Sequence, residues 1–488
     1  MVQGTRRLKK MSHGHQPPDD PFFSLPPHLC PGAESDDKSA SPPVASTAAA
    51  TAAAIADAAA AAETAALARI LHALSLYAPP ALAEVDRWER AAAALAPAHA
   101  AVLGRSLLAK HAAGRAAVSA NTAFLGDLVR AVVDGECGLG PGLAPHLAAA
   151  SAAAGAAVSA GVRPAPADIE KVRYLLRNAA RDWSAAGAGE RAACYGRLVA
   201  ALMEELKPPP PAAAAAAAAG GGEARPPAPR PRILVPGAGL ARLAVDLAAG
   251  GFCVEANEHS FYMLLGSAYL LNAGPTTAAP AAVHPWALSP SNRVSYAHQF
   301  RAVAIPDADA GALAAGGGPG GLAMVAGEFT AVYGRKEAGG PHQQPPPTFD
   351  GVATAFFLDC APNALAFIDT IAGCLRPGGL WVNCGPLLWH WEAGEGGGGA
   401  GGVWGAADDV GDDGDHAPHP APAAAATAAA WPHSLELSLE DVLAAAGAAG
   451  FDLVRPVEMV AGVPFNEDSG SMVVTTYTAA FWVMRKRG

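Results

Sequence analysis

The stretch ILVPGAGL, residues 233–240, decides the fold class of this chain. The apolar run 232–235 predicts a buried strand, and a helical pattern covers residues 240–249. Between them, Gly237 and Gly239 let the backbone approach a ligand without a Cβ clash, while N–H groups at the start of the helix face that ligand. A strand, a Gly-x-Gly turn and a helix together indicate a nucleotide-binding fold. The alternative is a glycine-rich turn that binds no ligand, which would show the same pattern.

An acidic residue supplies the second half of this pattern. Residues 252–256 predict a second strand and residues 260–272 a second helix, and Glu258 closes that strand 21 positions after Gly237. A carboxylate at this place can accept hydrogen bonds from both ribose hydroxyls of an adenosine. The pattern serves NAD and S-adenosylmethionine equally well, and an ordinary solvated acid would also fit it. The alternation of strands and helices predicts a parallel, doubly wound sheet.

Two further features favour a methyl donor over a dinucleotide. Arg242 stands where the NAD fingerprint has a glycine or alanine that lets helix and strand pack closely. Residues 349–359 predict a buried strand that ends in an acid, and a helix then leads through a Pro-Gly-Gly turn into another strand, residues 375–383. This arrangement resembles the fifth strand of class I methyltransferases. Residues 451–454 and 477–484 predict an antiparallel edge pair, so the expected fold class is α/β, a Rossmann-like, doubly wound class I methyltransferase sheet.

Composition divides the chain into four parts. Residues 1–64 are rich in proline, serine and alanine, which predicts disorder. Helical periodicity in residues 65–207 predicts an N-terminal all-helical region, and the Pro/Ala/Gly tract 208–230 predicts a linker. Residues 231–488 form the expected methyltransferase domain, with a disordered insertion at 391–432.

Charge and cysteine usage narrow the function classes. A formal net charge of −11 argues against a dedicated nucleic-acid binder. The seven cysteines show no CxxC or Cys/His spacing, which favours free thiols in a reducing compartment and no metal site. We expect no membrane span, because no run of 18 or more strongly apolar residues appears, and no secretory signal, because residues 1–10 lack an apolar segment.

Several long motifs resemble the N2227-like family of carnosine N-methyltransferases. The likeness covers residues 65–207 and 231–486, apart from the insertion at 391–432. Besides the glycine loop, the motifs that carry it are ARDWSAAGAGER (180–191), NEHSFYMLLGSAYLLN (257–272), GPLLWH (385–390) and ELSLEDV (436–442). The resemblance implies an S-adenosylmethionine-dependent N-methyltransferase that acts on the imidazole ring of carnosine or a related dipeptide. It also implies a cytoplasmic location, with the nucleus as a second location, and leaves a homodimer open.

The same resemblance assigns the cofactor site. The implied cofactor-binding residues are Asn178, Arg181, Gly237, Gly239, Glu258, Glu328, Phe329 and Ala355. Arg181 would pair with the methionine carboxylate, although by itself it reads as a solvated helix charge. Asn178 is a shorter amide than the family's glutamine, and Ala355 replaces a family cysteine. Glu328 would accept the adenine amine proton, and Phe329 would stack on the ring.

The acceptor side would use Asp359, His390 and Tyr477. An imidazole nucleophile needs one ring nitrogen with a free lone pair, and a carboxylate bonded to the other N–H fixes that tautomer. Asp359, at the carboxyl end of a strand, is the expected carboxylate, and the other two residues would orient the acceptor. Without the family resemblance, we would interpret His390 as a histidine of the core or its rim, and Tyr477 as a strand residue that only packs.

The chain departs from the family in two places. Thr475 and Thr476 stand where the family has tyrosines, and Ala241 stands where it usually has glycine, a change we expect to be accommodated. The lost tyrosines keep a second hypothesis open, methylation of another imidazole compound, a peptide or a protein histidine. A catalytically idle binding scaffold is a third hypothesis, and an NAD oxidoreductase is a fourth. Retention of the site residues argues against the scaffold, and Arg242 argues against the oxidoreductase.

Overall fold

A nine-stranded sheet forms the centre of the computed structural model. The structure describes residues 23–24, 44–140, 143–209, 229–314, 321–334, 348–389 and 435–488. In spatial order the sheet runs β1 (Phe23–Ser24), β6 (Leu322–Ala326), β3 (Cys253–Glu258), β2 (Arg232–Pro236), β7 (Phe349–Ala355), β8 (Leu375–Gly385), β11 (Thr476–Lys486) and β10 (Glu458–Pro464), with β9 (Phe451–Leu453) paired to the far end of β11.

The strand order confirms the predicted doubly wound class I methyltransferase sheet. Strands β6, β3, β2, β7 and β8 are parallel, and β11 runs antiparallel to β8. The winding reverses between β2 and β7, and ligands of such sheets bind beyond the carboxyl ends of the strands at this point. The predicted antiparallel pair of β9 and β11 is present, but it is not the edge of the sheet. Strand β10 pairs with β11, so β11 lies inside the sheet.

The Pro-Gly-Gly segment lies inside a strand and does not form a separate turn before one. Helix α14 (Ala364–Cys374) ends as predicted, but β8 begins at once with Leu375, which pairs with Phe349. The next pair is Gly351 with Leu380, so the intervening residues form a bulge, and Gly378 has a φ of +79° there.

Two hydrophobic cores cover the two faces of the sheet. Alternate residues of β2 separate them, since Ile233 and Val235 join one core and Leu234 joins the other. The first core contains α7 (Tyr195–Leu206), α9 (Arg242–Ala249) and α10 (Phe261–Ala268), and it continues into the N-terminal helices. The second contains α13 (Phe329–Tyr333), α14 and α16 (Leu439–Ala448).

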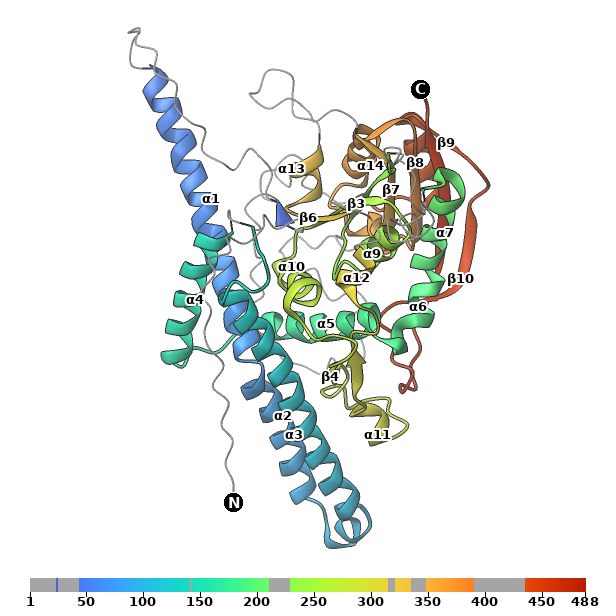
Figure 1. The fold of residues 1–488 in the computed structure, drawn as a ribbon. Helices are drawn as coiled ribbons and strands as arrows, with labels where there is room; N and C mark the ends of the chain where they lie inside the picture. The colour runs from blue at the N-terminus through green and yellow to red at the C-terminus, as the bar shows by residue number, and fades with distance from the viewer. Residues whose placement is uncertain are drawn as a thin grey trace, which may run out of the picture.

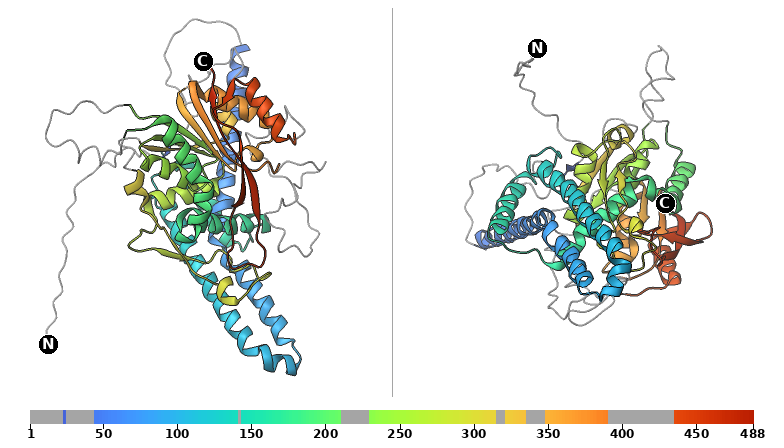
Figure 2. Two further views of the ribbon diagram at one scale, coloured as in Figure 1. Left: turned by 90° about the vertical axis from the view of Figure 1, so that its right-hand side faces the viewer. Right: turned by 90° about the horizontal axis from the view of Figure 1, so that it is seen from below.

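The N-terminal helices lie beside and beneath the sheet (Figure 1), with the first four on the left of that view and the last at its lower right. They are α1 (Val44–Ser75), α2 (Ala78–Ala93), α3 (Pro97–Val133), α4 (Ala144–Ser159), α5 (Pro166–Trp183) and α6 (Ala188–Ala193). Helices α2 to α5 each have proline in the first two positions, where the missing N–H costs no helical hydrogen bond. The α2–α3 hairpin projects away from the sheet, as Figure 2 also shows.

The first helix corrects the expected disorder of residues 1–64. Helix α1 begins at Val44, inside that stretch, and β1 pairs with β6. Alanine has the highest intrinsic helix propensity, so the composition that suggested low complexity also favours a helix. By length and composition α3 is the one described helix that could cross a membrane, which is weak evidence because core helices of soluble proteins pass the same test.

A two-stranded hairpin lies between the π-helical turn Tyr269–Ala273 and β6. Its strands are β4 (Ala281–Val283) and β5 (Val303–Ile305). Asn121 of α3 donates to the carbonyl of His284 and accepts from its N–H, at 3.0 and 2.7 Å. This reciprocal pair ties the hairpin to the helical arm.

Candidate functional site

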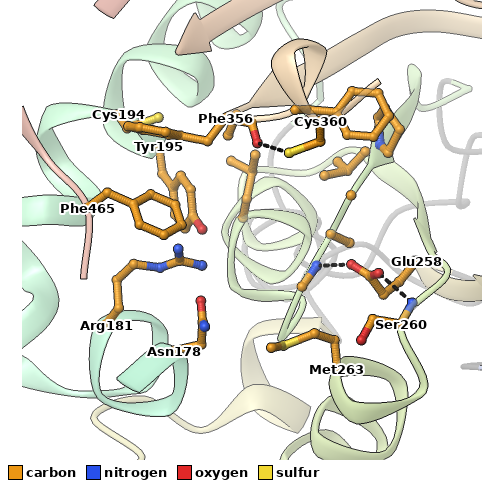
Figure 3. A pocket seen from close by; sticks show the side chains of 18 of the residues that line it. Asn178, Arg181, Cys194, Tyr195, Glu258, Ser260, Met263, Phe356, Cys360 and Phe465 are labelled. Carbon is orange, nitrogen blue, oxygen red and sulfur yellow. Dashed lines mark hydrogen bonds between the residues drawn. The ribbon is translucent and has the colours of Figure 1, made fainter. Parts of the chain in front are cut away.

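A cavity of about 410 Å³ lies at the carboxyl ends of β2, β3 and β7. The glycine loop after β2 and the start of α10 form one wall, and α5 with the α6–α7 junction forms the opposite wall. Figure 3 shows Asn178 and Arg181 on one side, facing Glu258 and Ser260 across the cavity. Six of the predicted cofactor residues line it, namely Asn178, Arg181, Gly237, Gly239, Glu258 and Ala355.

The glycine loop has the backbone geometry that its sequence demands. Gly237 and Gly239 adopt φ values of +65° and +56°, which favour glycine. A Cβ at Gly237 would lie 2.5 Å from the ring of Phe357. The loop is held from both sides, because Ala238 donates to Asn257 of β3 at 3.0 Å and Trp183 of α5 donates to the carbonyl of Leu240 at 3.0 Å.

Ala241, where the family usually has glycine, directly follows this loop. Ala241 also has a positive φ, +65°, and its side chain is fully buried. A left-handed conformation costs a non-glycine residue about 1–2 kcal/mol, so the family's glycine is the easier choice. The expectation that alanine is accommodated holds, but at the expense of backbone strain.

Glu258 is held in its charged form at the end of β3. Its Oε2 accepts from Gly239 N–H at 2.9 Å, and its Oε1 accepts from His259 and Ser260 N–H, each at 2.8 Å. Burial opposes the charge, yet His259 and these backbone donors outweigh it and lower the pKa of Glu258. The Glu258 carboxylate in turn raises the pKa of the His259 imidazole, whose Nδ1 lies 3.4 Å from Oε1. A buried carboxylate that faces the cavity beside the glycine loop suits a sugar diol.

Arg181 stands on the wall formed by α5, and its guanidinium has a fixed orientation there. Its Nε and Nη2 donate to the two carboxylate oxygens of Asp182 at 2.7 and 2.9 Å. The guanidinium lies 4.6 Å from the ring of Phe465 and 5.9 Å from that of Tyr195, whose hydroxyl also donates to Asp182. Because the planar fork is held by a carboxylate and two rings, Arg181 is positioned before any ligand arrives. Asn178, one turn earlier, donates to the carbonyl of Tyr174.

A charged cluster fastens this wall to the glycine loop. Asp307 accepts from Arg191 of α6 and from Arg242 of α9, both at 2.6 Å. Arg242 also donates to the carbonyl of Asp182 and to Asp246, and its guanidinium lies over Trp183. The residue that argued against an NAD fingerprint is therefore a clamp between α9 and the end of α5.

Asp359 lies beyond the cavity-lining residues Phe357 and Cys360. It belongs to a short 3-10 turn, Leu358–Cys360, that follows β7, and its side chain is 2% exposed. Oδ2 accepts from Leu388 N–H at 3.0 Å, whereas Oδ1 has no hydrogen-bond partner among the described residues. Burial raises the pKa of Asp359 to about 7, although the Leu388 bond works against this rise.

Tyr477 lies on the same side, in β11. Its ring is 5.8 Å from Phe356, edge to face. Its pKa is raised by burial and, second, by the charge of Asp359, so Tyr477 lies within electrostatic range of that carboxyl. Neither Asp359 nor Tyr477 lines the cavity itself, and Phe356 lies at the boundary. His390 falls outside the described residues.

Glu328 and Phe329, which were expected near the adenine, do not line the cavity. Glu328 caps α13, because its Oε2 accepts from Ala331 N–H at 2.6 Å and from the Thr330 hydroxyl at 2.8 Å. Phe329 is buried against Phe357 and does not line the cavity. Their adenine contacts therefore stay predictions. Among the described residues, no group of three or more His, Cys, Asp or Glu side chains could hold a metal ion.

Four residues of this site were not predicted from the sequence: Asp182, Asp307, Phe356 and Phe465. Asp182 and Asp307 stood within or beside the motifs, but a carboxylate that orients an arginine has no spacing signal of its own. Phe356 precedes Asp359 by three positions, and its left-handed backbone could not be foreseen. Phe465 lies far from Arg181 in the sequence, so only the fold brings the two side chains together.

Comparison with known proteins gives the family. The sequence pattern of carnosine N-methyltransferases matches residues 159–488, more than half of the chain. The chain belongs to the carnosine N-methyltransferase family. It is 35% identical to carnosine N-methyltransferase of Rattus norvegicus over 225 residues, which cover 46% of this chain and 49% of that one. The enzyme of that name from Schizosaccharomyces pombe is 36% identical over 225 residues, 46% and 54% of the two chains. The match thus spans about half the length of these curated relatives.

Proposed function

We propose that this protein is an S-adenosylmethionine-dependent N-methyltransferase that methylates the imidazole ring of carnosine or a related histidine-containing dipeptide. The observation that carries the proposal is Asp359, a buried carboxyl with an unpaired Oδ1 among the described residues, next to a cavity built on a glycine loop. Membership of the carnosine N-methyltransferase family supports the substrate class.

The residues of the cavity fit S-adenosylmethionine. Glu258 offers a charged oxygen beside the glycine loop for the ribose, and Gly237 and Gly239 leave room for the methionine part. Arg181, fixed by Asp182, offers a guanidinium to the carboxylate of that amino acid. When bound, the cofactor supplies an electrophilic methyl group on a sulfonium sulfur.

Asp359 would act on the acceptor ring. Its Oδ1 accepts the N–H of a neutral imidazole and so leaves the lone pair of the other ring nitrogen for the methyl group. As that nitrogen forms its new bond to the methyl carbon and the sulfur–carbon bond breaks, the positive charge would pass from sulfur to the ring, and the buried carboxylate would stabilise it at short range. The N–H proton can then move to Oδ1, because burial raises the pKa of Asp359 to about 7. Tyr477 and His390 are proposed to orient the acceptor.

A labelled-methyl assay tests this function. The full chain is incubated with S-adenosylmethionine carrying a labelled methyl group and with carnosine, free histidine or histidine-containing peptides. We expect label on the carnosine ring, and loss of turnover in Asp359→Ala with calorimetric binding of S-adenosylmethionine retained. Labelled acceptors without labelled carnosine would refute the substrate, and failure of the wild type to bind S-adenosylmethionine would refute the function.

One observation supports a second candidate, methylation of an imidazole in a longer peptide or a protein. Thr475 and Thr476, which stand in place of family tyrosines, are exposed and add no ring to the pocket. A more open acceptor side suits a larger substrate, and the peptide arm of the same assay decides between the two. A cytoplasmic or nuclear location and a homodimer stay predictions.

A further inference from the structure

Two phenylalanines line the cavity on the side of the proposed acceptor. Phe356 directly follows β7 and Phe465 directly follows β10, and both rings are half-buried. Their centroids lie 4.7 Å apart, and Phe356 also contacts Tyr477 at 5.8 Å. The guanidinium of Arg181 lies 4.6 Å from the ring centroid of Phe465. Figure 3 shows these two side chains facing each other. A continuous aromatic row therefore joins the arginine of the cofactor wall to the tyrosine of the acceptor side.

The backbone holds Phe356 in place at an energetic cost. Its φ is +48°, a left-handed conformation that non-glycine residues rarely adopt. Its N–H donates to the carbonyl of Cys384 at 3.0 Å, and Gly385 packs so closely that a Cβ there would lie 3.1 Å from the nitrogen of Phe356. Such strain persists only where the surroundings enforce it, and it is concentrated at binding sites.

We propose that Phe356 and Phe465 form the specificity-determining wall for a flat heteroaromatic acceptor. The proposal rests on the function proposed above and names the residues that select the acceptor ring. The faces of the two rings pack against an imidazole, and they attract the positive charge that develops on it during methylation. Thr475 and Thr476 offer no ring to the acceptor, so in this chain the two phenylalanines supply aromatic surface on that side. The wall predicts a preference for imidazoles over aliphatic amines.

The test separates acceptor binding from cofactor binding. Phe356→Leu and Phe465→Leu should each raise the KM for carnosine about tenfold, which corresponds to one aromatic contact. The Kd for S-adenosylmethionine should change less than about threefold in Phe356→Leu, because Phe356 is not one of the two rings that lie against Arg181 and Asp182 still holds the guanidinium. Phe465→Leu removes one of those rings and should raise this Kd as well. Phe465→Tyr keeps a ring and should stay within about threefold of the wild-type KM.

Two further variants exclude a merely structural role. Phe356→Gly removes the ring and relieves the strained backbone, so it should raise the KM while the thermal midpoint changes little. Phe451→Leu is the matched control, because Phe451 is buried in β9, which pairs with the end of β11 that lies far from Tyr477. It should lower the thermal midpoint and leave the KM unchanged.

The outcomes distinguish this proposal from the proposed function. Unchanged KM values in both leucine variants, or equal losses of cofactor and acceptor affinity in Phe356→Leu, would overturn the aromatic wall while the function stands. A wild type that binds S-adenosylmethionine but labels no imidazole would overturn the function, and this proposal with it.

Discussion

Replacing Asp359 by asparagine should change both turnover and the pH dependence of stability. The substitution keeps the shape of the side chain and the acceptor for Leu388 N–H, but it removes the ionisable group. Turnover should fall about 10²- to 10⁴-fold, since the variant can neither take the imidazole proton nor stabilise the developing charge.

The stability effect follows from burial of the carboxyl. Its pKa in the folded protein is about 7, against an ordinary value of 3.8. Between these two values the folded state holds a proton that the unfolded state has lost, so the free energy of unfolding falls as the pH rises through this range. At about 1.4 kcal/mol per pKa unit, the wild type should lose about 4 kcal/mol between pH 4 and pH 8 relative to Asp359→Asn.

Urea unfolding of both proteins at several pH values measures this difference. Other titrating groups are common to the two proteins and cancel, and a buried asparagine amide without an acceptor shifts the variant by a constant amount. The difference in unfolding free energy should therefore move steadily in favour of the variant up to about pH 7 and then level off. Parallel curves would show that Asp359 ionises normally and would refute its role as proton acceptor.

Three other changes test the cofactor wall. Gly237→Ala should lose binding of S-adenosylmethionine and about 2–5 kcal/mol of stability, because it strains the backbone and clashes with a neighbouring ring. The control is Gly378→Ala, which also has a positive φ but lies in open space, and it should lower the free energy of unfolding in urea by only about 1–2 kcal/mol. Asp307→Asn leaves the buried guanidinium of Arg191 without its carboxylate and should cost about 3 kcal/mol, and an unchanged unfolding curve would contradict the clamp. Glu258→Gln should raise the calorimetric Kd for S-adenosylmethionine about tenfold. Because the folded pKa of Glu258 is lowered, the stability that it gives the wild type over this variant should be lost as the pH falls through that pKa.

Local patterns predicted the parts of the site that depend on short sequence separations. The glycine loop and Glu258 follow directly from a strand, a turn and a second strand, because neighbouring parallel strands end at the same edge of the sheet. The predicted helix that follows residue 359 is α14, which is capped by Asn363, whereas α16, capped by Ser438, was not predicted. Arg181 was assigned only through the family, and its fixed orientation comes from Asp182 beside it.

The remaining parts depend on contacts that no local pattern encodes. Strand β10 lacks alternation because a bulge separates Val460 and Val463, both buried, so it was not predicted. The left-handed backbone of Phe356 depends on β8, and the unpaired oxygen of Asp359 depends on how the chain closes over it. A sequence pattern names which residue types stand at a strand end, but only tertiary packing decides which of them is deprived of water.

The clamp at Asp307 has a consequence for the modularity of the chain. Composition suggests a natural cut at 208–230, which would release residues 231–488 as a free-standing catalytic unit. Such a fragment would keep the glycine loop and Asp359 but lose the entire face that carries Arg181, and it would leave Asp307 and Arg242 without the partners contributed by α5 and α6. The catalytic module is thus assembled from both sides of that tract, and a truncation that respects the apparent boundary divides the cofactor pocket in two.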